Sequence, residues 1–128
     1  MSSRVLIVDD DTDLRETLAR LLGRFGHTCL LAASGSEAIG LMQTGSPDLV
    51  VTDLHMRGMD GMAVARQARQ ARPPIPVVLM TAYPMADTKR AEDSPTFHLA
   101  KPFANADMIA VVERALHGSR VAAGRDGR

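Results

Sequence analysis

Aspartate, threonine and lysine side chains occur where short apolar runs of this chain end. They are Asp9, Asp10, Asp53, Thr81 and Lys101. Carboxylate oxygens bind hard divalent cations, and magnesium usually takes one or two carboxylates while keeping several waters. A lysine ammonium group and a hydroxyl beside such a cation can bind the oxygens of a phosphoryl group. These residue types together indicate phosphoryl transfer assisted by Mg²⁺ or Mn²⁺.

Asp53 is the candidate nucleophile of this set, because it stands alone at the end of its run. An aspartate carboxylate can attack phosphorus and form an aspartyl phosphate. Asp9 and Asp10, crowded near it, would repel it unless a cation neutralised them. A doubled aspartate can instead cap the following helix, a role also open to Asp11 or Asp13. The occurrence of all five residues at run ends, in this order, favours the phosphoryl site.

Apolar runs alternate with segments of helical periodicity, which predicts an α/β fold with a parallel sheet and helices on both faces. The runs are continuous, as strands buried on both faces require. Strands are expected at residues 5–8, 28–32, 48–52, 77–80 and 96–100, and helices at residues 14–25, 34–42, 62–71 and 103–116. A capping box at Ser34–Glu37 opens the second helix, and Gly26 ends the first. Because the carboxyl ends of parallel strands share one edge, the polar residues should meet there in a shallow pocket.

The bulk composition describes one soluble domain. The chain has 128 residues, of which 45% are hydrophobic and 23% charged, and its 15 basic and 15 acidic residues balance. The balance gives no nucleic-acid footprint and no apolar run approaches a membrane span, so we expect a cytoplasmic protein. Cys29 is expected to be a buried residue on a strand. Residues 84–95 predict at most one short helix, and residues 118–128 predict a disordered tail after a domain at 1–117.

Four ordered segments resemble the receiver domain of bacterial response regulators. They are Val5–Asp11, Leu49–Met56 followed by Gly58–Gly61, Val78–Ala82 and Leu99–Phe103. The likeness runs from residue 4 to about residue 117. It implies a doubly wound, flavodoxin-like sheet of parallel strands in the order 2-1-3-4-5. It also implies a phospho-accepting switch of a two-component or phosphorelay pathway, which handles only its own phosphoryl group and is not a classified enzyme.

The resemblance also implies a role for each site residue. The magnesium ion would be bound by the carboxylates of Asp10 and Asp53 and by the backbone carbonyl of His55. Asp9 would bind it either directly or through water. The phosphoryl group would be bound by Thr81, Ala82 and Lys101. The bond between Lys101 and Pro102 is commonly cis in the family. Phosphorylation would draw Thr81 toward Asp53 and repack the face formed by the short helix expected within residues 84–95, the fifth strand and the last helix.

The sequence departs from the family pattern at four places. Arg57 stands where proline is usual in the loop after the acceptor. His98 replaces the aromatic switch residue, and an imidazole there could still move between buried and exposed positions or simply lie on the surface. The segment before the fifth strand is short and holds Asp93–Pro95. The helix expected within residues 84–95 would therefore be short, displaced or mobile. Tyr83 and His55 flank the phosphoryl site, where bulk could slow hydrolysis or a histidine base could speed it.

Two other functions fit some of these residues. A phosphohydrolase of the haloacid dehalogenase type would use Asp9 and Asp11, but it needs an acidic pair after Lys101 and leaves Asp53 unexplained. A degenerate receiver would bind partners without phosphorylation. The partners implied for the switch are a sensor histidine kinase or phosphotransfer protein as donor and an unidentified output protein. No direct contact with nucleic acid or membrane is expected, and the form in solution would be a monomer or weak homodimer.

Overall fold

The computed structural model describes residues 3–56, 58, 60–82 and 96–126, with side chains described through residue 118. The strands are β1 (Arg4–Val8), β2 (Thr28–Ala32), β3 (Leu49–Asp53), β4 (Val77–Thr81) and β5 (Thr96–Ala100). The helices are α1 (Thr12–Arg24), α2 (Gly35–Gly45), α3 (Gly61–Gln70) and α4 (Asn105–Asp126). Within these residues, no helix is both long and apolar enough to cross a membrane.

The strands form one parallel sheet in the order β2-β1-β3-β4-β5, as the family resemblance implied. Val8 of β1 pairs with Thr52 of β3. Thr81 of β4 pairs with Ala100 of β5. The residues that follow these pairs therefore come to the same edge of the sheet, where the candidate site was expected.

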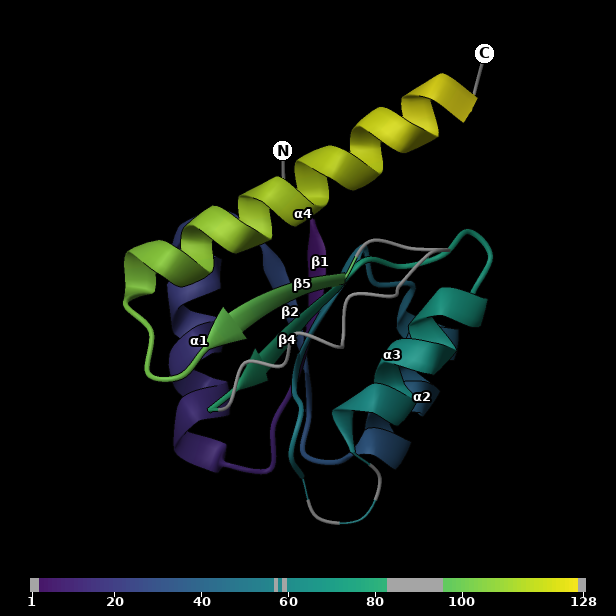
Figure 1. Ribbon diagram of the computed structural model, residues 1–128. Helices are drawn as coiled ribbons and strands as arrows, with labels where there is room; N and C mark the ends of the chain where they lie inside the picture. The colour runs from purple at the N-terminus through teal and green to yellow at the C-terminus, as the bar shows by residue number, and fades with distance from the viewer. Residues whose placement is uncertain (1–2, 57, 59, 83–95, 127–128) are drawn as a thin grey trace.

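Helices cover both faces of the sheet (Figure 1). On one face, Leu18 of α1 and Met108 of α4 are buried in one cluster with Ile7. On the other face, α2 and α3 pack, and Val64 is buried in a cluster with Leu6. Successive side chains of a strand point to opposite faces, so the adjacent Leu6 and Ile7 fall into different clusters. Burial on both faces is the reason that the strands appear in the sequence as continuous apolar runs.

Side-chain caps fix where the helices begin near the site. The Asp11 carboxylate caps α1 by accepting two backbone N–H groups of its first turn. The capping role that a doubled aspartate could have had therefore falls to Asp11. Ser34 caps α2 by accepting from the N–H of Glu37, whose carboxylate accepts from the N–H of Ala33. The predicted capping box is thus present, with its return bond one residue earlier. Asp60 caps α3.

The predicted bounds of β2 and β5 are confirmed, and most others are shifted slightly. β3 and β4 each include the polar residue at their end, Asp53 and Thr81. α1 ends at Arg24, and Gly26 beyond it has a φ of 90°, a conformation that glycine adopts without steric cost. Asp53 and Thr81 are therefore fixed by sheet hydrogen bonding, whereas Asp9, Asp10 and Lys101 directly follow their strands.

The predicted end of the last helix was wrong. α4 begins at Asn105 and continues through Asp126, past Leu116 where we expected it to end. Residues 118–126 are helical, although the glycines of this segment favoured disorder. The alanines and arginines between these glycines have high helix propensity, and each residue added to an existing helix gains a hydrogen bond. The domain boundary predicted at residue 117 stays a prediction, and the helix predicted within residues 84–95 lies outside the described residues.

Cys29 lies on β2, as predicted, but this edge strand leaves it only partly buried. Its sulfur lies 3.8 Å from the carbonyl oxygen of Ala19 in α1. Burial raises the pKa of the Cys29 thiol. The thiol is therefore protonated at neutral pH and a poor nucleophile, which keeps it out of the candidate chemistry.

Candidate functional site

Three carboxylates meet at the carboxyl edge of the sheet. Asp9 and Asp10 follow β1, and Asp53 ends β3, the strand beside it. One carboxylate oxygen from each lies within 4.8 Å of the other two. The structure thus brings together residues far apart in the chain, as the strand pattern predicted.

Asp9 is the most enclosed of the three, with none of its surface exposed. Its Oδ1 accepts a hydrogen bond from the N–H of Asp11 at 2.9 Å. Its buried Oδ2 accepts no hydrogen bond from the described residues. Burial is the main cause that raises the pKa of Asp9, and the charges of Asp53 and Asp10 act in the same direction. The negative charge of Asp9 is therefore incompletely compensated by the protein itself.

Lys101 supplies the positive charge of the site. Its Nζ lies 3.4 Å from Oδ1 of Asp53 and 3.8 Å from Oδ2 of Asp9. The backbone N–H of Lys101 donates to the carbonyl oxygen of Thr81 at 2.8 Å. The bond from Lys101 to Pro102 is cis, as the resemblance implied. Lys101 is thus anchored to the end of β4 while its ammonium group lies between two carboxylates.

Asp53 is held in place through its backbone and its immediate neighbours. Its Oδ1 accepts a long hydrogen bond, 3.4 Å, from the N–H of His55. The N–H of Leu54 donates to Met80 in β4 at 2.8 Å. The N–H of Gly61, at the start of α3, donates to Leu54 at 2.8 Å. These bonds fix the chain on the far side of Asp53, so its carboxylate is presented at the edge of the sheet.

Gly61 is a positioning residue that the sequence did not single out. A Cβ on Gly61 would overlap the carbonyl oxygen of Asp53 and lie 2.8 Å from Cα of Leu54. Glycine therefore allows α3 to start directly against the acceptor strand. Several glycines of this chain occur in segments predicted as helices or loops. No feature of the sequence shows which of them lies against the backbone of another segment.

The remaining predicted site residues have different positions. Thr81 is almost fully buried at the end of β4, next to the anchored Lys101, whereas Ala82 and His55 are exposed beyond their strand ends. His98 is an exposed residue of β5. The part of its side chain that the protein covers lowers its pKa, because the charged imidazole is less well solvated there. This placement agrees with both roles left open for His98. Tyr83 lies outside the described residues, as does the departure at residue 57.

The donor set fits a hard divalent cation. Its side-chain ligand atoms are carboxylate oxygens, which Mg²⁺ and Mn²⁺ prefer. The buried Oδ2 of Asp9, without a hydrogen bond from the described residues, is an acceptor that a cation or its bound water can satisfy. The residues present therefore fit the metal ion that the sequence implied, and the cluster is compact enough to share one ion.

Asp107 and Glu113 of α4 follow Lys101, and neither joins this cluster. Asp107 accepts a hydrogen bond from the N–H of Ala104 at the start of α4, at 3.2 Å. Glu113 pairs with His27 at 3.0 Å. Neither is among the described carboxylates that could share an ion. The hydrolase alternative therefore lacks its required acidic pair after Lys101 within the described residues.

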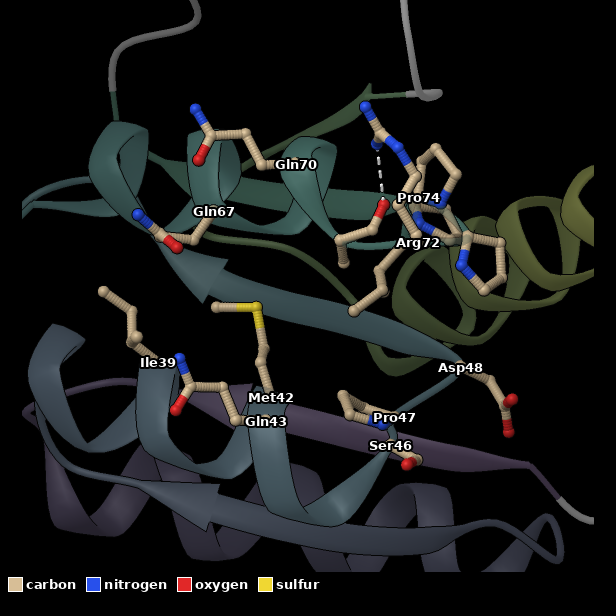
Figure 2. A pocket seen from close by; sticks show the side chains of 14 residues that line it. Ile39, Met42, Gln43, Ser46, Pro47, Asp48, Gln67, Gln70, Arg72 and Pro74 are labelled. Atoms are coloured by element: carbon tan, nitrogen blue, oxygen red, sulfur yellow. Dashed lines mark hydrogen bonds between the residues drawn. The ribbon is translucent and has the colours of Figure 1, made fainter.

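A cavity of about 660 Å³ lies at the other end of the strands. Figure 2 shows Met42 and Gln43 of α2 below Gln67 and Gln70 of α3, with Arg72 at one end. Its walls include residues that precede β3 and β4, whereas Asp53 and Thr81 end those strands. The cavity therefore takes no part in the acidic site.

Known proteins share both the sequence pattern and the fold. A family model described as the response regulator receiver domain matches residues 5–113. The DNA-binding transcriptional regulator NtrC of Salmonella typhimurium is 38% identical over 114 residues, which cover 88% of this chain and 24% of that protein. The response regulator MprA of Mycobacterium ulcerans is 34% identical over 123 residues, or 94% of this chain and 53% of that protein. The chain thus spans about a quarter to a half of these relatives.

A solved structure agrees at the level of the fold. The chemotaxis response regulator CheY4 of Vibrio cholerae superposes with a TM-score of 0.81 at 25% identity. The match covers 91% of this chain and the whole of that one. The two folds therefore agree over most of this chain.

Proposed function

We propose, from the premise that this chain belongs to the response regulator receiver domain family, that Asp53 is its phosphoacceptor and that Mg²⁺ or Mn²⁺ assists the transfer. The observation that carries the proposal is the position of Lys101 Nζ, 3.4 Å from Asp53 and 3.8 Å from Asp9. It supports the proposal because an ammonium group, which can bind phosphoryl oxygens, lies close to the candidate nucleophile and to the buried Asp9 of the same cluster. A structural salt bridge alone would not need the third carboxylate.

In the transfer, a carboxylate oxygen of Asp53 attacks phosphorus of a phosphohistidine or a small acyl phosphate. A new phosphorus–oxygen bond forms as the bond to the leaving imidazole or acyl oxygen breaks. Asp9, Asp10 and Asp53, with the carbonyl of His55, would hold the cation, which would supply positive charge to offset that of the phosphoryl oxygens. The charge that develops on these oxygens also falls beside the Lys101 ammonium group.

The other site residues bind the phosphoryl group of the aspartyl phosphate and change position when it is present. The Thr81 hydroxyl, the Ala82 N–H and Lys101 bind the phosphoryl oxygens, and movement of Thr81 with His98 alters the surface around β5. His55 and Tyr83 control the access of water to the aspartyl phosphate. The phosphoryl donor is a sensor histidine kinase or phosphotransfer protein, and the phosphorylated surface binds an output protein. The chain acts in the cytoplasm as a monomer or weak homodimer and as a switch, not as an enzyme on other substrates.

The proposal is tested by incubating the protein with acetyl phosphate and Mg²⁺ and measuring intact mass, with Asp53→Asn alongside. We expect one phosphoryl adduct that requires Mg²⁺ and is absent from the variant. Beryllofluoride binding without an adduct would still support a competent site, one with fast hydrolysis. The absence of both the adduct and beryllofluoride binding would contradict the proposal and favour a degenerate receiver.

A further inference from the structure

The guanidinium group of Arg15 is bound to the backbone beside the acidic cluster. Its Nη1 donates to the carbonyl oxygen of Asp9 at 2.6 Å, and its Nη2 donates to the hydroxyl of Thr12 at 3.4 Å. The backbone N–H of Arg15 donates to the carbonyl of Asp11 at 3.0 Å. The first turn of α1 therefore reaches back to the end of β1 through a side chain.

This contact fixes the peptide that carries Asp10. The carbonyl of Asp9 belongs to the planar unit that includes the backbone nitrogen and Cα of Asp10. The side chain of Asp9 is fixed as well, because its Oδ1 accepts a hydrogen bond from the N–H of Asp11 at 2.9 Å. Asp10 thus lies between two residues whose orientation is set by hydrogen bonds. Its carboxylate and that of Asp9 can face Asp53 without further ordering of the backbone.

We infer that Arg15 is a positioning residue for the divalent cation, because it pre-orients the Asp9–Asp10 pair. The inference rests on the proposed function of the same site. Arg15 binds neither the cation nor the phosphoryl group. Its effect is on the entropy that the ligands lose when the cation binds, since the backbone is already ordered in the free protein.

Two effects of the Arg15 side chain on cation affinity have opposite signs. Its positive charge, close to the acidic cluster, repels a divalent cation. Its hydrogen bond to Asp9 orders the ligands and favours the cation. Arg15 is partly exposed, so solvent and salt screen the repulsion, whereas the short hydrogen bond keeps its geometry. The ordering effect is therefore the larger one, and the sign of the change on substitution distinguishes the two.

The test compares Mg²⁺ affinity, by calorimetric titration of the full chain, for wild type, Arg15→Ala, Arg15→Lys and Arg20→Ala. Arg20 is an exposed arginine of the same helix and controls for the loss of one positive charge. We expect Arg15→Ala to weaken Mg²⁺ binding by about tenfold, the loss typical of one hydrogen bond to a charged group. Arg15→Lys should recover part of the affinity, because an ammonium group can still donate to the Asp9 carbonyl. The difference should persist in high salt.

Phosphorylation by acetyl phosphate gives a second readout. For Arg15→Ala we expect a higher Mg²⁺ concentration at half-maximal rate and an unchanged rate at saturating Mg²⁺. Equal or tighter Mg²⁺ binding by Arg15→Ala, with wild type binding normally, would overturn the inference alone. Absence of Mg²⁺ binding by wild type would overturn the proposed function and this inference with it. Because Arg15 is a surface residue of α1, urea unfolding of each variant verifies that the fold is retained.

Discussion

The ammonium nitrogen of Lys101 lies 3.4 Å from a carboxylate oxygen of Asp53, at the edge where their strands end. A lysine so close to the acceptor neutralises part of the charge that the carboxylates bring together. It also competes with a divalent cation for the same oxygens. In the free protein it is an internal counter-ion of the site, and in the proposed function it would bind the phosphoryl group after transfer.

Replacement of Lys101 by methionine should therefore separate these two roles. We expect Mg²⁺ affinity to rise by about threefold or more, since a competing charge near 4 Å is removed. We expect phosphorylation by acetyl phosphate to slow by about a hundredfold, the loss typical of one charge-stabilising donor. Calorimetric titration and intact-mass kinetics measure the two quantities. Weaker Mg²⁺ binding in Lys101→Met would show that the lysine supports the cation site instead of competing with it.

The raised pKa of Asp9 predicts a pH dependence of stability in the metal-free protein. Burial is its main cause, and the charges of Asp53 and Asp10 add to it. The folded state keeps the proton on Asp9 at pH values where the unfolded chain has released it. The Asp9 contribution to the free energy of unfolding is therefore fully present below the ordinary pKa of 3.8 and is lost as pH rises through the raised value.

Urea unfolding between about pH 4 and about pH 7, in the presence of a metal chelator, measures this contribution. It is the difference in the free energy of unfolding between wild type and Asp9→Asn. We expect wild type to lose stability relative to the variant as pH rises. Saturating Mg²⁺ should reverse the difference at neutral pH, because the ion stabilises only the carboxylate form. A constant difference across this range would show that Asp9 ionises as it does in the unfolded chain.

The glycine at the start of α3 should not tolerate a methyl group. A Cβ at Gly61 meets the backbone of Asp53 and Leu54, which cannot move without displacing the acceptor. We expect Gly61→Ala to lower the free energy of unfolding by about 1–3 kcal/mol and to slow phosphorylation. Gly40→Ala is the matched control, because a Cβ there meets nothing within 4 Å on the same kind of element.

That control substitution should be neutral or stabilising by about 0.5–1 kcal/mol, as alanine usually is in place of a helical glycine. Urea denaturation measures both variants. Equal effects of Gly61→Ala and Gly40→Ala would mean that the close approach of α3 to the acceptor strand is not required.

A buried histidine joins α4 to the rest of the domain. The His27 side chain is 3% exposed, and its Nε2 lies 3.0 Å from Oε2 of Glu113. Its Nδ1 has no hydrogen bond from the described residues. Glu113→Ala leaves the buried ring without this partner, and we expect a loss of about 1–2 kcal/mol in the free energy of unfolding. Glu113→Gln keeps an acceptor and should lose less, so equal losses would assign the effect to helix packing.

The fold and the centre of the site could be predicted because both depend on patterns within short segments. Continuous apolar runs specify strands buried on two faces, and the residue that ends each run marks its carboxyl end. Parallel strands share that edge, so the approach of Asp9, Asp53 and Lys101 follows without any distances. The cis bond before Pro102 followed from the family resemblance alone.

Other features depend on contacts through space that no local pattern contains. The reach of Arg15 to the Asp9 carbonyl depends on how α1 leaves the sheet. The need for glycine at position 61 depends on how closely α3 approaches β3. The length of α4 was also mispredicted, because helix propagation outweighed two glycines that would favour coil in isolation.

The candidate site takes its charged groups from the ends of β1, β3 and β5, so it exists only when the whole sheet is assembled. A bound ion and phosphoryl group would therefore act as a non-covalent cross-link between distant parts of the chain. A ligand that binds only the folded state adds about 2.7 kcal/mol to the free energy of unfolding at a hundredfold excess over its Kd. In this sense the phosphorylated state that we propose would also be the more stably folded one.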